Sequence, residues 1–376
     1  MNVRWAVELP TIGLAKMTAV GTWAGSLEDA TESSMHLHTI DPLSDSRWDD
    51  LVAFHPKASV FHQRGWLQAL ASTYGYRPRV MTSTPPGKPL SNGVVFCEIR
   101  SWITGRRLVS LPFADHCEPL LSESDDALEF EQWMRVEGDR GHWRYIELRP
   151  LSWNSQAGWA GQSFWFHTLN LQPSLDQVFS GFHKDSIQRR IRRAERERLS
   201  YEVGSSDNLL DDFYRLLVTT RKRHRLLPQP REWFRNLIAG MGSNIQIRCV
   251  RKNDRPVAAL LSLRHRQTVV YKYGCSDQEF HHLAGMPYLF WKLIEESKAA
   301  GADQIDFGRT DMDNEGLITF KDRFGTTRSR ITYVRYPEVA KPKSLATQMS
   351  IARSVFSLFP NVLLPWAGRM VYRHIG

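Results

Sequence analysis

A predicted β-hairpin constrains the fold of this chain more than any other feature of its sequence. Residues 257–264 and 268–274 are predicted strands separated by a tight turn, and residues 287–300 form a predicted helix after them. Along most of the chain, helix-like and strand-like segments alternate, which is typical of α/β proteins. Because a hairpin requires antiparallel neighbours, we predict a mixed α/β fold with partly antiparallel sheets flanked by helices.

The alternation of helix-like and strand-like segments occurs twice along the chain. Its 376 residues are enough for two domains of roughly 100–200 residues each. We expect a poorly ordered N-terminal extension at 1–34, domains at 35–170 and 171–340, and a tail at 341–376. Apolar residues at helical spacing predict an amphipathic helix in the tail, either docked on the body or touching a membrane. Since the ordered pattern begins at Met35, both Met1 and Met35 stay candidate translation starts.

Composition and targeting signals favour a cytoplasmic protein, with peripheral membrane contact left open. No segment reaches the ~20 apolar residues of a membrane span, and Glu8 and Pro10 interrupt the apolar run near the N-terminus. The four cysteines form no CxxC pair and are expected to be reduced. The cluster Asp115–Glu118 contains metal-ligand residue types, but adjacent side chains point in different directions, so we predict no metal site.

Positive charge is concentrated in one predicted helix. The net charge is +9, and the segment 183–198 carries seven cations, among them Lys184, Arg189, Arg190 and Arg193. Arginine suits bidentate contact with phosphate. This segment therefore predicts binding of a polyanion, either nucleic acid, an anionic membrane or a phosphorylated substrate, although a solvated surface remains the simpler alternative.

A second phosphate-binding candidate is Gly285, at the start of the helix that follows the hairpin. Backbone N–H groups and the helix dipole favour an anion there. The segment 282–287 resembles the loop with which acetyltransferases hold the pyrophosphate of coenzyme A. His282 and Pro287 depart from that pattern, and a proline lacks an N–H donor.

The segment 306–325 predicts a site at the end of a buried strand. Asp306 and Arg309 lie at the strand end, and Phe320 and Lys321 return after a polar loop. A cation such as Lys321 can stabilise a tetrahedral oxyanion, while Asp306 or Asp311 accepts the proton of an attacking amine. The structural alternative pairs Lys321 with Asp322 or Glu315. Because no Ser-His-Asp or Cys-His pattern is evident, we predict direct attack without a covalent enzyme intermediate.

Five segments together resemble the FemAB-related proteins, which are bacterial transferases built from two GNAT-like halves. They are LPFADHCEPL (111–120), the basic helix, KYGCSD (272–277), DFGRT (306–310) and GLITFKDRFG (316–325). The resemblance covers about residues 40–335. It implies two tandem GNAT-like domains and the transfer of an amino acid from aminoacyl-tRNA to an amine of a peptidoglycan precursor.

The family has an adjacent Phe-Lys pair, whose lysine stabilises the reacting carbonyl, and this pair matches Phe320 and Lys321. Its basic helix, linked to tRNA or to acceptor phosphates, matches the segment around Arg190. Tyr273, in the KYGCSD segment, joins the expected binding residues. The long helical arm of some tRNA-dependent relatives is missing here, which keeps other acyl donors open.

The expected function is therefore the transfer of an acyl or aminoacyl group to an amine of a cell-envelope precursor, of peptidoglycan or of a surface polysaccharide. No tightly bound cofactor is expected, and the donor is either aminoacyl-tRNA or acyl-CoA. The alternatives are an acyl-CoA-dependent GNAT N-acetyltransferase and a non-catalytic polyanion-binding protein. The partners expected are the precursor, tRNA and the inner membrane surface; the sequence leaves the oligomeric state open.

Overall fold

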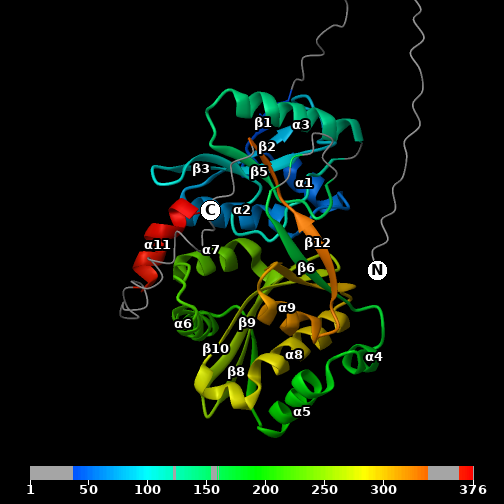
Figure 1. Cartoon of the computed structure of the whole chain (residues 1–376), viewed down its shortest axis with the longest axis vertical. Coiled ribbons are helices and arrows are strands. Elements are labelled where there is room, and N and C mark those ends of the chain that lie inside the picture. Colours follow the sequence, from blue (N-terminus) through cyan, green and yellow to red (C-terminus); the bar gives the residue numbers. More distant parts are fainter. Residues whose placement is uncertain (1–36, 122–123, 154–158, 160, 338–363, 376) are drawn as a thin grey trace, which may run out of the picture. The chain divides into compact units, whose positions relative to one another are not determined.

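The computed structural model describes residues 37–121, 124–153, 159, 161–337 and 364–375 (Figure 1). Within this part of the chain the strands form two sheets, one with the order β1-β2-β3-β4-β5-β13 and one with the order β12-β6-β11-β10-β9-β8-β7. Helices flank both sheets, and most strand pairs are antiparallel. The predicted mixed α/β class is confirmed.

The six-stranded sheet contains one parallel pair, β4 with β5, among antiparallel neighbours. Its strands are β1 (His38–Ile40), β2 (Arg77–Thr82), β3 (Val94–Ser101), β4 (Gly105–Val109), β5 (Tyr145–Leu148) and β13 (Val334–Tyr336). The helices of this half are α1 (Arg47–Phe54), η1 (Val60–His62), α2 (Arg64–Tyr74) and α3 (Ser124–Asp139).

The seven-stranded sheet likewise contains one parallel pair, β10 with β11. Its strands are β6 (Ser163–Asn170), β7 (Ser200–Gly204), β8 (Ile245–Lys252), β9 (Arg255–His265), β10 (Thr268–Ser276), β11 (Gln304–Asp311) and β12 (Thr327–Thr332). The predicted hairpin is the antiparallel pair β9–β10, in which Thr268 lies opposite His265.

The helices of the second half surround this sheet (Figure 1). They are α4 (Leu175–Ser180), η2 (Lys184–Gln188), α5 (Arg189–Arg196), α6 (Asp207–Arg223), α7 (Arg231–Met241), η3 (Gly242–Asn244), η4 (Gln278–Leu283), α8 (Gly285–Ala299) and α9 (Glu315–Asp322). The last described helix is α11 (Leu364–Ile375). Among the described helices, none combines the length and the apolar character that crossing a bilayer requires.

Two strands pair outside the order of the chain. Strand β6 pairs with β11 and β12 in the second sheet, and β13, near the end of the described body, pairs with β5 in the first. The expected domain boundaries stay a prediction. The extension at 1–34 and most of the tail, including the apolar residues at 345–359, lie outside the described residues.

One apolar core extends from the first half into the second, where α2 packs against α7. Gly65 and Gly240 allow this approach, because a Cβ atom on Gly65 would lie 2.2 Å from the carbonyl oxygen of Gly240. Trp66 and Trp233 pack edge to face beside them, with ring centroids 5.2 Å apart. The described residues from Leu37 onward accordingly belong to one compact unit, which holds the two halves of the candidate site together.

Candidate functional site

The candidate site lies where the parallel strands β10 and β11 stop pairing. Their register runs from Thr268 opposite Gln304 to Val270 opposite Asp306. Just beyond this point both strands are irregular against their other neighbours, β10 between Tyr271 and Tyr273 and β11 between Asp306 and Gly308. A β-bulge re-aims side chains and ends regular pairing, so the two irregularities direct Lys272 and the Asp306 region toward the first half.

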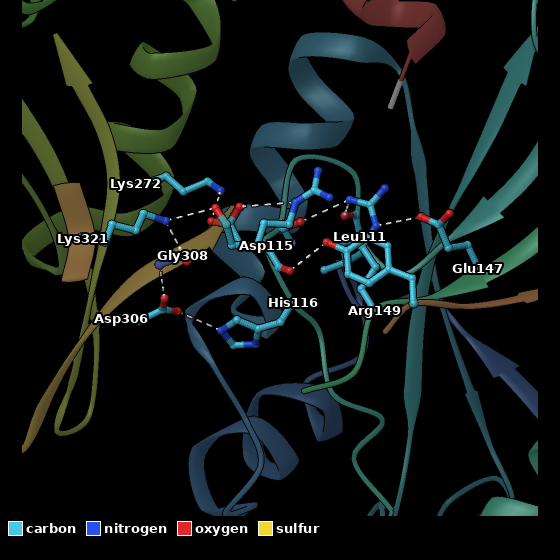
Figure 2. A network of polar contacts seen from close by, with 12 residues as sticks. Leu111, Asp115, His116, Glu147, Arg149, Lys272, Asp306, Gly308 and Lys321 are labelled. Carbon is cyan, nitrogen blue, oxygen red and sulfur yellow. Dashed lines mark hydrogen bonds and ion pairs between the residues drawn. The ribbon is translucent and has the colours of Figure 1, made fainter. Parts of the chain in front are cut away.

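A loop from the first half meets these strands with two side chains (Figure 2). Asp115 Oδ2 lies 2.7 Å from Lys272 Nζ. The next residue, His116, places Nε2 3.0 Å from Asp306 Oδ2, and Asp306 Oδ1 accepts a hydrogen bond from the Gly308 N–H at 2.6 Å. Polar side chains of the 111–120 loop thus join strands of the second sheet.

Lys321, on α9, is 2% exposed and points at the backbone of β11. Its Nζ donates to the carbonyl oxygens of Gly308 and Arg309, at 2.9 and 3.1 Å. Burial lowers the pKa of Lys321 to about 8, although Asp115 and Asp306 favour its charged form. An amine with this pKa exchanges its proton near neutral pH.

Asp115 is held as a carboxylate by the cations around it. Burial raises its pKa, but the charges of Lys272 and Arg309 outweigh that effect and leave the pKa below its ordinary value. The guanidinium of Arg309 also lies 4.0 Å from the ring centroid of Phe164. The Tyr333 hydroxyl donates to the Asp115 carbonyl oxygen at 2.8 Å, which fixes the loop on the second half.

Arg149 fixes the same loop from the side of the first sheet (Figure 2). Its Nη1 donates to the carbonyl oxygens of Leu111 and Ala114, at 2.7 and 3.2 Å, and its Nε lies 2.9 Å from Glu147 Oε1. A charge-assisted contact of this kind is geometrically specific. Asp115 and His116 are therefore presented from a loop anchored on both sides.

A pocket of about 410 Å³ lies where the second sheet meets α8, α9 and η2–α5. Its lining includes Arg190, Gly285, Phe320 and Arg323. Gly285 begins α8 after Ala284, whose φ of 58° is left-handed, and no side chain caps the helix. The first backbone N–H groups of a helix are free to bind an anion, although Pro287 has none to offer.

The structure thus brings three predicted residues, Arg190, Gly285 and Phe320, to one pocket. Lys321, which follows Phe320 in α9, and Asp306 lie in the polar network instead of the pocket lining. Asp311, the alternative proton acceptor, is exposed at the end of β11. Lys321 bonds to backbone carbonyl groups rather than to the carboxylates proposed as its structural partners.

The other predicted binding residues lie apart from the pocket lining. Arg189 and Lys184 are exposed, and Arg189 Nη1 lies 2.8 Å from Asp185 Oδ1. Arg193, also exposed, lies 3.6 Å from Glu197. Tyr273 is buried, and its hydroxyl accepts a hydrogen bond from Trp233 Nε1 at 3.0 Å.

Sequence reasoning assigned no role to Asp115, His116 or Lys272, although all three lie in segments that carry the family resemblance. The signal available was a histidine and a carboxylate side by side in the 111–120 segment. In the structure, Cys117 Sγ lies 3.3 Å from His62 Nε2, and Glu118 Oε1 accepts from the Ser152 N–H at 3.1 Å. The neighbouring side chains of the segment Asp115–Glu118 therefore each contact a different partner.

Comparisons with known proteins agree with this architecture. Residues 181–321 match the model of the acetyltransferase (GNAT) domain family. No curated protein gives a significant match to the sequence. Among solved structures, FemX is 12% identical and superimposes with a TM-score of 0.59, covering 80% of this chain and 97% of its own.

Two further structures have the same fold. The C-terminal domain of a putative lysylphosphatidylglycerol synthetase from Agrobacterium fabrum is 12% identical, with a TM-score of 0.50 and coverage of 86% of this chain and 97% of that one. A tandem GNAT protein from the clavulanic acid biosynthesis pathway is 9% identical, with a TM-score of 0.50 and coverage of 80% and 98%. Residues 181–321 thus resemble a GNAT domain, and the chain has the two-sheet fold of FemX and of tandem GNAT proteins.

Proposed function

We propose that this protein transfers an acyl or aminoacyl group to an amine of a cell-envelope precursor, of peptidoglycan or of a surface polysaccharide. One observation carries the proposal: Arg190, the start of α8 at Gly285 and Phe320 line one pocket, and the buried Lys321 follows Phe320 in α9. The GNAT match and the fold shared with FemX support it.

In this proposal the pocket holds the donor. A phosphate of the donor lies at the start of α8 and is neutralised by Arg190, which lines the same pocket. Phe320, an aromatic residue of the lining, packs on the acyl chain. Aminoacyl-tRNA and acyl-CoA both present phosphates and an activated carbonyl, so the same pocket chemistry suits either donor.

The chemical step is direct attack of the acceptor amine on the donor carbonyl. The new C–N bond forms as the C–O bond of the ester, or the C–S bond of a thioester, breaks. The cysteines offer poor nucleophiles, since burial raises the pKa of Cys117 and of Cys249 to about 12. A covalent enzyme intermediate on sulfur is therefore disfavoured.

Lys321 stabilises the oxyanion of the tetrahedral intermediate. Two of its three N–H donors are taken by carbonyl oxygens of β11, which leaves one for the reacting oxygen. With its pKa lowered to about 8 by burial, it can also return a proton to the leaving oxygen or sulfur.

The Asp306–His116 pair receives the proton of the amine. Asp306 Oδ2 is hydrogen-bonded to His116 Nε2. The other ring nitrogen, His116 Nδ1, is buried without a hydrogen-bond partner among the described residues. A buried polar atom of this kind calls for a functional explanation. A carboxylate that orients an imidazole whose second nitrogen accepts the proton is a general-base arrangement.

Binding of charged tRNA, uncharged tRNA and acetyl-CoA at physiological salt tests the donor. Preference for charged over uncharged tRNA supports aminoacyl transfer to a peptidoglycan precursor. Absence of binding to any activated acyl donor, with salt-sensitive binding to both tRNAs alike, would contradict the transferase and favour a non-catalytic polyanion-binding protein.

The alternative donor is acyl-CoA, which would make the protein a GNAT N-acetyltransferase. The matched domain model and the position of Gly285 at the pocket favour it. Acetyl-CoA should then raise the thermal stability of the wild-type protein but not of Arg190→Gln. This result would identify the donor as a thioester. In either case we place the reaction in the cytoplasm.

A further inference from the structure

The turn between β3 and β4 exposes two large apolar side chains next to each other. Trp102 is 88% exposed and Ile103 57%, and Trp102 is the most exposed of the large apolar residues described. A single exposed apolar residue is ordinary on a protein surface. An adjacent tryptophan and isoleucine at the end of a hairpin form a protruding apolar tip, and Figure 1 shows this turn extending beyond the sheet near α11.

The turn is held rigidly by its own hydrogen bonds. Ser101 pairs with Gly105 across the hairpin and closes a three-residue loop. Ser101 Oγ accepts from the backbone N–H groups of Ile103 and Thr104, at 3.1 and 2.9 Å. Because these hydrogen bonds already order the loop, inserting its two apolar side chains into an apolar environment costs little further conformational entropy.

Helix α11 extends the apolar tip. The Thr104 hydroxyl donates to the His374 carbonyl oxygen at 2.7 Å, and the His374 ring packs edge to face on Trp102, with centroids 5.8 Å apart. Met370, one helical turn before His374 and on the same helix face, is 54% exposed. We call Trp102, Ile103 and Met370 the apolar tip.

Exposed arginines lie on the strands and the helix that carry the apolar tip and on the neighbouring strand β2. They are Arg79, Arg100, Arg106 and Arg373, with Arg144 in the segment before β5. The first three share a single carboxylate, that of Glu98, at 3.0, 2.5 and 3.2 Å. One carboxylate cannot neutralise three guanidinium groups, so these four side chains together keep a net positive charge.

We propose that the apolar tip and its arginine flank dock the protein on an anionic lipid bilayer. Tryptophan prefers the interface between headgroups and acyl chains, and isoleucine reaches the acyl boundary. The arginines meet lipid phosphates there. A nucleic acid fits this surface less well, because it offers phosphates for the arginines but no apolar medium for Ile103. Docking goes beyond the proposed reaction and suits an acceptor attached to a membrane.

Vesicle flotation with the full chain tests the docking. The probes are vesicles of phosphatidylglycerol mixed with phosphatidylcholine, and vesicles of phosphatidylcholine alone. We expect the wild-type protein to float with the anionic vesicles, and Trp102→Ser/Ile103→Ser to lower the partition coefficient about tenfold or more. Phe54→Ser is the matched control, since Phe54 is 85% exposed on α1, and it should float like the wild type.

A second variant tests the charge. Arg144→Gln/Arg373→Gln should weaken binding to anionic vesicles several-fold, and added salt should reduce this difference. All of these side chains are exposed, so thermal unfolding should be unchanged.

Two results would overturn the docking: failure of the wild-type protein to float with anionic vesicles, or flotation of the Trp102→Ser/Ile103→Ser protein equal to wild type. Loss of tRNA binding in that variant, with vesicle binding intact, would assign the tip to RNA. Flotation needs neither donor nor acceptor, so its outcome is independent of the transferase proposal.

Discussion

Lys272 and Asp115 form an ion pair 157 residues apart in sequence, with Nζ 2.7 Å from Oδ2. It joins an irregular strand of the seven-stranded sheet to a loop of the other half. Asp115 also lies 3.9 Å from the Arg309 guanidinium. One carboxylate of the first half therefore balances two cations at the edge of the candidate site.

Removing one partner of this ion pair should destabilise the protein. Asp115→Asn leaves Lys272, whose side chain is 6% exposed, without its counter-charge. We expect a loss of about 3 kcal/mol in the free energy of unfolding, measured by urea denaturation. The double variant Asp115→Asn/Lys272→Met should lose less than the sum of the two single variants. Simple additivity would show that the pair contributes nothing as a pair.

Gly308 should resist substitution because of Asp115. Its φ is +74°, and a Cβ atom there would lie 3.1 Å from Asp115 Oδ2. Gly308→Ala should therefore cost about 2 kcal/mol of unfolding free energy. Gly87→Ala is the matched control, since its φ is +79° in open space, and it should cost about 1 kcal/mol. Equal costs would mean that backbone strain alone, without the Asp115 contact, explains the glycine.

Because of Lys321, kcat/KM should decrease at alkaline pH. The ammonium form is needed for the oxyanion and is lost as pH rises through the pKa of about 8. We expect kcat/KM to fall above about pH 8, and Lys321→Met to lower turnover ~100-fold or more while the protein stays folded by circular dichroism. Unchanged turnover in a folded Lys321→Met protein would remove Lys321 from the mechanism.

The same pKa affects stability with a defined sign. Between about pH 8 and the ordinary lysine pKa of 10.5, the unfolded chain binds more protons at this site than the folded one. The contribution of Lys321 to the free energy of unfolding therefore rises with pH in this window, by at most about 1.4 kcal/mol per pH unit. Lys321→Met should remove that slope in urea titrations, and an unaltered slope would contradict the lowered pKa.

Arg190 and Arg189 are neighbours in sequence but differ in position. Both side chains are exposed, but Arg190 lines the pocket, whereas Arg189 pairs with Asp185. Arg190→Gln should weaken donor binding about tenfold, a typical effect of losing one charge-assisted phosphate contact. Arg189→Gln, the matched control, should change it less than threefold. Equal losses, measured by calorimetry with the donor that binds, would indicate a diffuse electrostatic surface instead of a phosphate site.

His116 and Asp306 should behave as one unit. His116→Gln and Asp306→Asn should each lower turnover about 100-fold or more, and the double variant should be little worse than either single variant. Steady-state kinetics of the three folded variants checks this. If KM alone rises, with kcat unchanged, the pair only shapes the site and carries no proton.

Part of the site could be predicted because it lies within single segments. The strand that contains Gly308 and the adjacent residues Phe320 and Lys321 are local patterns, and the basic helix shows its charge directly in sequence. Their meeting at one pocket depends on helix packing. Only Arg190 of the predicted cations lines that pocket, because the direction of a side chain on a charged helix is set by what the helix packs against.

The sequence by itself determined the mixed α/β class, the β9–β10 hairpin and the residues of the site segments, because periodicity and turn chemistry act over a few neighbouring residues. The tertiary structure alone decided that β13 returns to the first sheet. It also decided that Asp115 and His116 meet Lys272 and Asp306, and that Lys321 points at backbone carbonyl groups. These contacts join residues far apart in the chain, and they follow from strand register and helix packing, which no local pattern encodes.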